Sequence, residues 1–137
     1  MTKKRVIIVG CSRLGSTLAA KMSLAGEDVV LLDKKESSFR KLPDGFAGFQ
    51  LVGDGTDVDT LEYAGIRDAK MILCTTDDDN VNLLIAQLAD KIYEVNRVYI
   101  RLADSEKSKL LENTNIVAVY PFHLSVGAFE ELISSDD

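Results

Sequence analysis

The sequence predicts an α/β domain built around a doubly wound, six-stranded parallel sheet. Three observations lead to this prediction. Short apolar runs recur along the chain, and amphipathic stretches with helical spacing separate them. The runs are apolar throughout instead of alternating with polar residues, which is typical of strands buried on both faces. A helix between two strands returns the chain to the same end of the sheet, so strands that alternate with helices run parallel. Such connections are almost always right-handed.

The expected strands follow directly from the apolar runs. The first is RVIIV at residues 5–9, and the others are residues 29–32, 49–52, 71–74, 98–100 and 116–119. Each is short and rich in residues that favour strands. For a doubly wound sheet of this kind we expect the strand order 3-2-1-4-5-6, which makes the fold Rossmann-like.

The stretches between the strands are expected to be helical. One face of residues 14–25 carries Leu14, Leu18, Met22 and Ala25. Residues 78–93 would form the longest helix, with an apolar face of Val81, Leu84, Ile85, Leu88 and Ile92. Shorter helices are expected over residues 34–42, 58–64, 105–113 and 122–133, with Ser105 as an N-cap and residues 134–137 frayed.

Length and composition limit the possible classes of protein. The chain has 137 residues, of which 46% are apolar and 28% charged, as in ordinary globular domains. The predicted elements use this whole length, so we expect one domain over residues 1–137 and no C-terminal ligand-sensing domain. The net charge of −6 disfavours nucleic acid as a partner. No apolar run approaches the roughly 20 residues that span a bilayer, so direct membrane insertion is not expected.

The first motif with chemical meaning follows the first predicted strand. Residues 10–15 read Gly10-Cys11-Ser12-Arg13-Leu14-Gly15, which is the G-x-G-x-x-G spacing with a serine in the second position. Gly10 allows a tight turn into the helix, and Gly15 allows close packing of helix on strand. The amides and dipole at the helix start favour a phosphate, to which the Ser12 hydroxyl could also donate. A glycine turn without a ligand is the alternative.

An acid at the end of the second strand extends this pattern. Asp33 stands where a carboxylate accepts hydrogen bonds from an adenosine ribose. Its charge would repel a 2′-phosphate, so NADP is disfavoured. Lys34 could offset the charge of a phosphate, although a solvated lysine is the simpler interpretation. Asp33 could likewise be an ordinary solvated acid.

Two further loops are expected at the same edge of the sheet. Residues 53–57 (GDGTD) form a turn after the third strand, in which Asp54 could face an adenine edge. Residues 75–80 (TTDDDN) lead from the fourth strand into the next helix, at the point where the strand order reverses. Thr75 and Thr76 could reach a nucleotide there. The three aspartates are better explained as helix-capping acids than as metal ligands.

These motifs occur together in one known family. The loop at residues 10–15, Asp33, residues 53–57, LEYAGIRDA at residues 61–69 and residues 75–80 jointly resemble the nucleotide-binding N-terminal domain of Trk/Ktr potassium-uptake regulatory subunits and the RCK domains of potassium channels. The resemblance extends over nearly the whole chain. It implies a cytoplasmic regulatory subunit that binds NAD(H), ATP, ADP or AMP. It also implies a homodimer or larger ring beneath a membrane potassium transporter or channel, which the ligand gates by changing the shape of the assembly.

The resemblance also implies a role for each matching residue. Gly10, Cys11, Ser12, Arg13, Leu14 and Gly15 would hold phosphates, and Asp33, beside Lys34, would bind the ribose. Asp54, Gly55 and Thr56 would surround the adenine, with Thr75, Thr76 and Asp77 on the opposite lip. Arg101, at the end of the fifth strand, would reach a terminal phosphate, including one across a dimer. Family members often carry an acid soon after the proline that follows strand six. Here Phe122 and His123 follow Pro121, so no bridging cation is expected.

The sequence contains few groups that suggest catalysis. One histidine and no recognisable triad or carboxylate pair are present, so neither catalytic residues nor a metal site is predicted. A short NAD-dependent oxidoreductase, or a fragment of one, remains the alternative, as does an assembly domain without a working site. Cys11 and Cys74 are too few for a disulfide framework, and Cys11 stands at a helix start, where the pKa of a thiol can be lowered.

Overall fold

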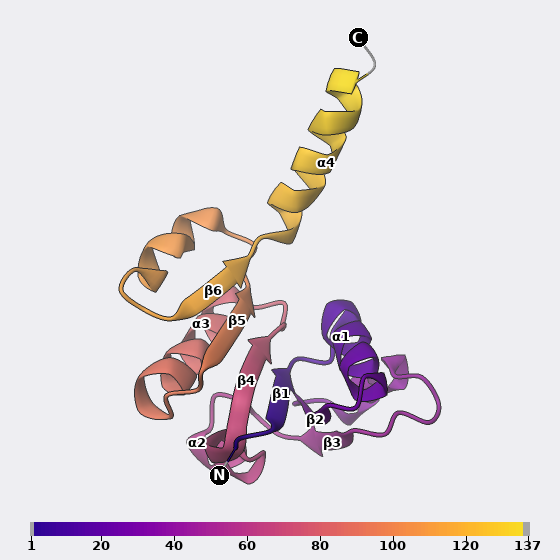
Figure 1. The fold of residues 1–137 in the computed structure, drawn as a ribbon, viewed down its shortest axis with the longest axis vertical. Coiled ribbons are helices and arrows are strands. Elements are labelled where there is room, and N and C mark those ends of the chain that lie inside the picture. Colours follow the sequence, from indigo (N-terminus) through magenta and orange to yellow (C-terminus); the bar gives the residue numbers. More distant parts are fainter. Residues whose placement is uncertain (1, 136–137) are drawn as a thin grey trace.

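A computed structural model describes residues 2–135 and confirms the predicted α/β fold (Figure 1). The strands are β1 (Arg5–Val9), β2 (Asp28–Asp33), β3 (Phe49–Val52), β4 (Ala69–Cys74), β5 (Arg97–Arg101) and β6 (Ile116–Val119). They pair in parallel in the order β3-β2-β1-β4-β5-β6, as the sequence predicts. The chain crosses from one half of the sheet to the other between β3 and β4, so β1 and β4 are neighbours at the switch point.

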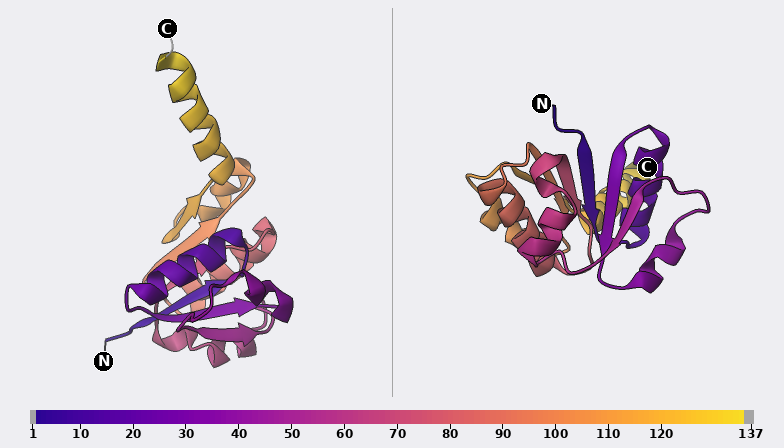
Figure 2. Two further views of the ribbon diagram at one scale, coloured as in Figure 1. Left: turned by 90° about the vertical axis from the view of Figure 1, so that its right-hand side faces the viewer. Right: turned by 90° about the horizontal axis from the view of Figure 1, so that it is seen from below.

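Helices cover both faces of this sheet (Figures 1 and 2). The α-helices are α1 (Arg13–Leu24), α2 (Val58–Tyr63), α3 (Asp79–Gln87) and α4 (Pro121–Ser135). Shorter 3-10 helices are η1 (Glu36–Lys41), η2 (Ile66–Asp68) and η4 (Ser105–Leu111), and α3 continues into one turn of π-helix, η3 (Leu88–Ile92).

Alternate residues of β1 pack into two hydrophobic clusters, one on each face of the sheet. Val6 and Ile8 face the side of α1 and η1, where they pack with Ala19 and Phe39. Ile7 and Val9 face the side of α2 and α3, in a larger cluster that includes Leu61 and Ile85. Burial on both faces explains why the central strands are apolar throughout. The edge strands differ, because Phe49, Val52, Val117 and Val119 remain exposed.

The predicted apolar face of α3 is partly wrong. The structure buries Leu83, Ile85, Ala86 and Ala89, whereas Leu84 and Ile92 are 48% and 63% exposed. The buried face of α3 also includes the polar residues Asp79 and Asn82, so the spacing of apolar residues alone does not define it. The cap of η4 also differs: Asp104, not Ser105, accepts the capping hydrogen bond, from the Glu106 amide.

The C-terminal helix stands apart from the sheet (Figure 1). With 15 residues, α4 is longer than α3, which the sequence predicts to be the longest helix. No residue of α4 is buried. Ser134 and Ser135 lie within the helix, where their hydroxyls donate to the carbonyls of Glu130 and Leu132, so the predicted fraying does not begin there. The predicted fraying of Asp136 and Asp137 lies outside the described residues.

Candidate functional site

A cleft of about 450 Å³ opens at the carboxyl ends of β1, β2, β3 and β4. Four segments line it: Val9 and Gly10; Asp33, Lys34, Lys35 and Ser38; Gly53, Asp54 and Gly55; and Thr76, Asp77, Asp78 and Val81. This is the edge of a doubly wound sheet at which ligands bind in other proteins. Of the residues predicted to bind a cofactor, Gly10, Asp33, Lys34, Asp54, Gly55, Thr76 and Asp77 line the cleft directly.

The glycine turn fits tightly against the β4–α3 segment. Gly10 has a φ of 105°, a conformation that residues with a Cβ rarely adopt. A Cβ at Gly10 would lie 2.7 Å from the Thr76 amide nitrogen, and one at Gly15 would collide with the Gly10 carbonyl oxygen. Both glycines are therefore required for the chain to turn from β1 into α1 without displacing the opposite wall of the cleft.

Ser12 caps α1 instead of offering its hydroxyl to a ligand. The Ser12 side-chain oxygen accepts from the Gly15 amide at 3.0 Å and donates to the Thr75 carbonyl at 2.8 Å. Its only proton is therefore engaged, contrary to the expectation that it could donate to a phosphate. Arg13 and Leu14 follow in the exposed first turn of α1, whose leading amides have no acceptor within the helix.

Thr75 lies behind the turn and not on its surface. The residue is only 4% exposed, and its hydroxyl oxygen lies 2.9 Å from the Gly10 carbonyl oxygen, to which it donates. We expected Thr75 to reach a nucleotide. The structure instead assigns its side chain to holding the glycine turn in place.

Asp33 is held by two backbone amides at the end of β2. The Cys11 amide donates to Oδ2 and the Lys35 amide to Oδ1, each at 2.8 Å. The carboxylate thus joins the glycine turn to the residues after β2. Each oxygen keeps a further lone pair, and Asp33 lines the cleft, so it can accept additional hydrogen bonds there.

Asp54 shapes the loop after β3. Its Oδ1 accepts from the Thr56 amide at 2.9 Å and from the Thr56 hydroxyl at 2.7 Å, and these hydrogen bonds hold the pKa of Asp54 below its usual value. The Lys34 ammonium lies 3.8 Å from the other oxygen. Thr56 does not line the cleft and supports the loop from behind. Lys34 and Asp54 form an ion pair on one side of the cleft.

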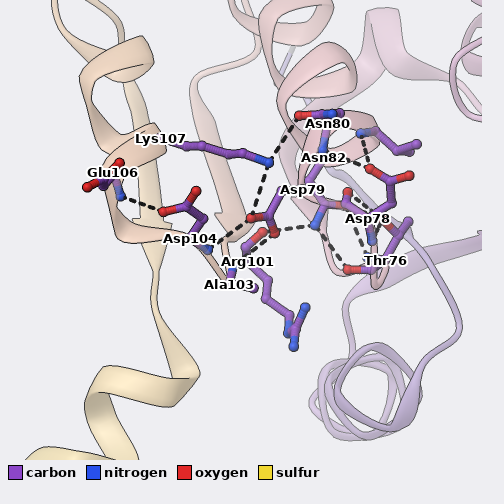
Figure 3. A network of polar contacts seen from close by, with 11 residues as sticks. Thr76, Asp78, Asp79, Asn80, Asn82, Arg101, Ala103, Asp104, Glu106 and Lys107 are labelled. Carbon is purple, nitrogen blue, oxygen red and sulfur yellow. Dashed lines mark hydrogen bonds and ion pairs between the residues drawn. The ribbon is translucent and has the colours of Figure 1, made fainter.

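Asn82 ties the opposite lip, residues 76–78, to β5, and Asp79 holds the segment after β5; sequence reasoning missed both roles (Figure 3). Asn82 contacts Thr76 and the Arg101 carbonyl. Asp79 accepts from the amides of Ala103 at 2.8 Å and Asp104 at 2.9 Å. We interpreted the acidic run as capping residues, which is confirmed for Asp78, because its carboxylate accepts from Asn80 and Val81. Asp79 and Asn82 are both buried, which no pattern of apolar residues in the sequence reveals.

Charge and burial distinguish Asp79 from its neighbours. Burial raises the pKa of Asp79, but the two amides and the Lys107 ammonium, 3.7 Å away, outweigh this effect, so the net pKa lies below the usual value. The carboxylate is consequently ionised at neutral pH and acts as a fixed anchor for the segment after β5.

Arg101 ends β5 as predicted but does not line the cleft. Its carbonyl accepts from Asn82, and its side chain extends away from the Asp79 contacts (Figure 3). The assignment of its guanidinium to a phosphate stays a prediction.

Both cysteines are buried thiols. Burial raises the pKa of Cys74 and of Cys11, and the nearby Asp33 carboxylate raises that of Cys11 further against the lowering effect of Lys41. The pKa of Cys11 is therefore raised, although a position at a helix start can lower the pKa of a thiol.

Within residues 2–135, no group of three or more His, Cys, Asp or Glu side chains is arranged to hold a metal ion. Among the described helices, none is long and apolar enough to cross a membrane.

The strand order, the glycine turn before α1 and the acid at the end of β2 define a Rossmann-like domain of the kind built around a nucleotide cleft. Comparison with known proteins then identifies the family. The TrkA-N domain model matches residues 6–121, and the chain belongs to this family. The resemblance and the fold predicted from sequence are confirmed.

Individual relatives agree with this assignment. The Trk system potassium uptake protein TrkA of Streptomyces coelicolor is 33% identical over 114 residues, which cover 83% of this chain and 51% of that protein. The chain spans about half the length of this protein and of the TrkA homologues of Pyrococcus horikoshii and Pyrococcus abyssi.

Solved structures share the fold. The TrkA-N domain of the inner membrane protein YbaL from Escherichia coli has a TM-score of 0.82 and 16% identity, with 94% of this chain and 96% of that chain covered. The Kef CTD of Shewanella denitrificans in its AMP-bound form has a TM-score of 0.72 and 26% identity, with 95% of this chain and 79% of that chain covered.

Proposed function

We propose that this domain binds an adenine nucleotide, NAD(H), ATP, ADP or AMP, in the cleft at the carboxyl ends of β1–β4. The main support for this proposal is the orientation of the Asp33 carboxylate, which the Cys11 and Lys35 amides hold at the cleft. A pre-oriented carboxylate is suited to the two hydroxyls of a ribose. Its negative charge disfavours the 2′-phosphate of NADP. The AMP-bound Kef relative supports this ligand class.

The remaining residues of the cleft fit the other parts of such a ligand. The exposed start of α1, at Arg13 and Leu14, supplies amides and a positive dipole end for phosphates. Gly10 allows the backbone of the turn to approach them. Gly53, Asp54 and Gly55 form the side on which an adenine would lie, and Thr76 and Asp77 form the opposite lip. Arg101 would act on a terminal phosphate.

We further propose that the domain acts as a regulatory part of a potassium-uptake system on the cytoplasmic side of the membrane. The Streptomyces relative, named as a Trk potassium uptake protein, supports this role. A nucleotide that fits one shape of an oligomer better than another shifts the population toward that shape, by no more than its difference in affinity. Such a shift could be passed to a membrane potassium transporter or channel.

The exposed apolar side chains of α4 support an oligomer. Phe122, Leu124, Val126, Phe129, Leu132 and Ile133 are all exposed on a helix that stands away from its own sheet. Such a surface is costly in water and favours a homodimer or larger ring. Replacement of Phe129 by Glu should then lower the molecular mass measured by sedimentation. Equal masses for the variant and the parent chain would argue against α4 as the interface.

Calorimetric titration tests the nucleotide site directly. We expect AMP, ADP, ATP and NAD to saturate one site, and NADP to bind much more weakly than NAD. An absence of heat with every nucleotide at millimolar concentration would overturn the proposal. The same samples, given NADH and a panel of small carbonyl compounds, should show no oxidation of NADH, because we propose a regulatory and not a catalytic site. Steady turnover would favour the oxidoreductase alternative.

A further inference from the structure

Asn82 is a completely buried polar residue in α3, and it does not line the cleft. Burying an amide without hydrogen-bond partners is strongly unfavourable, so the contacts of such a residue indicate its role. Its side chain makes hydrogen bonds in two directions, toward Thr76 on the lip of the cleft and toward Arg101 at the end of β5 (Figure 3).

Toward the cleft, Asn82 engages every polar group of Thr76. The Asn82 Oδ1 atom lies 3.1 Å from the Thr76 amide nitrogen and 2.6 Å from its hydroxyl oxygen, and it accepts from both. The Asn82 Nδ2 group donates to the Thr76 carbonyl at 3.0 Å. The Thr76 hydroxyl also contacts the Asp78 backbone, but only Asn82 contacts the amide, the hydroxyl and the carbonyl of Thr76 together, so it fixes the position of that residue.

The position of Thr76 in turn limits how far the glycine turn can move toward the lip. Gly10 lies so close to the Thr76 amide that even a Cβ would clash there. The width of the cleft between the turn and the lip is thus set by where Asn82 holds Thr76. A small outward movement of the lip would remove a wall from the proposed phosphate and ribose side of the cleft.

Toward the sheet, Asn82 fixes the lip to β5. Its Nδ2 group also donates to the Arg101 carbonyl at 2.9 Å. The next residue, Leu102, donates from its amide to the Val119 carbonyl at 3.0 Å, at the end of β6. The lip therefore moves with the ends of β5 and β6 and not as a free loop.

We propose that Asn82 is a positioning residue for the nucleotide cleft: it holds the Thr76 lip against the glycine turn and joins that lip to the end of β5, without touching the ligand. This inference rests on the proposed nucleotide site. An asparagine is required because one side chain must supply an acceptor for Thr76 and donors for two carbonyls. Aspartate keeps the acceptor and loses the donors, and leucine has neither.

Asp79 provides a matched control from the preceding turn of the same helix. It is also buried and anchors the segment directly after β5, but its contacts are Ala103, Asp104 and Lys107, and none is on the lip. Asp79→Asn should therefore destabilise the fold in the same region while leaving Thr76 in place.

The experiment compares AMP affinity by calorimetry for the parent chain, Asn82→Leu, Asn82→Asp and Asp79→Asn, well below the melting temperature of each. We expect Asn82→Leu to bind at least about tenfold more weakly, since it loses several hydrogen bonds that shape the site. Asn82→Asp should also bind more weakly than the parent, and Asp79→Asn should stay within about twofold of it.

Each outcome has one meaning. Parent-like AMP affinity in Asn82→Leu overturns the positioning role, as does an equal loss in Asp79→Asn. If Asn82→Leu does not fold, the Asn82→Asp variant decides, and parent-like affinity there overturns the inference. If the parent chain itself binds no nucleotide, the proposed function fails first, and the inference fails with it.

Discussion

Replacing Asp33 by asparagine tests the residue on which the nucleotide site depends most. The change keeps the shape of the side chain. It leaves one oxygen for either the Cys11 or the Lys35 amide, and it turns an NH2 group toward the other. One hydrogen bond to a charged acceptor is lost, and one backbone amide is left without a partner. Such a loss costs about 1.5–3 kcal/mol of stability.

The same change should weaken nucleotide binding. A neutral side chain with one acceptor oxygen cannot serve the amides and the ribose hydroxyls together. A loss of about 1.4 kcal/mol in binding corresponds to a tenfold weaker affinity, and we expect at least that for AMP. Urea denaturation measures the first effect and calorimetric titration the second.

Asp44→Asn is the control for this experiment. It removes the same charge from an exposed aspartate in the loop before β3, away from the cleft lining. Stability and AMP affinity should both stay close to those of the parent chain. The reasoning is refuted if Asp33→Asn binds AMP as tightly as the parent, or if Asp44→Asn loses as much affinity.

Three other predictions follow from the same contacts. Gly10→Ala should destabilise the fold by about 1–3 kcal/mol more than Gly26→Ala, because both glycines have positive φ but only Gly10 faces backbone atoms of the neighbouring segment; equal melting temperatures would contradict this. Asp79 has a lowered pKa in the folded state, so the stability that it contributes is complete above about pH 4 and is lost as the pH falls through its folded pKa. Asp79→Asn should therefore reduce the loss of stability at acid pH, measured by denaturation at several pH values. An unchanged loss would show that other groups are responsible for it. Cys11 and Cys74 have raised pKa values and are buried, so a thiol reagent at about pH 8 should modify neither until the chain is unfolded; rapid labelling of native Cys11, read by mass spectrometry, would count against its burial.

The sheet could be predicted from sequence because its central strands obey one strong rule. Residues buried on both faces must be apolar, and β1 and β2 satisfy that rule without interruption. The glycine spacing and Asp33 could be placed for a similar reason, since a tight turn and a strand-end acid leave local signals. These signals are sufficient to place the cleft at the correct edge of the sheet.

The parts that sequence reasoning missed depend on distant contacts. Whether the hydroxyls of Ser12 and Thr75 face a ligand or the protein is decided by carbonyls 63 and 65 residues away, which no local pattern contains. The buried face of α3 includes the polar residues Asp79 and Asn82, so the spacing of apolar residues does not reveal it. Asn82 resembles any polar helix residue until the ends of β4 and β5 are brought together around it.

The most direct test of the account is a crystal structure of the domain with AMP. The account predicts an adenosine over the carboxyl ends of β1 and β2, with its ribose hydroxyls within hydrogen-bond distance of the Asp33 carboxylate and its phosphate at the start of α1. AMP bound elsewhere, or bound in this cleft with its ribose turned away from Asp33, would contradict it.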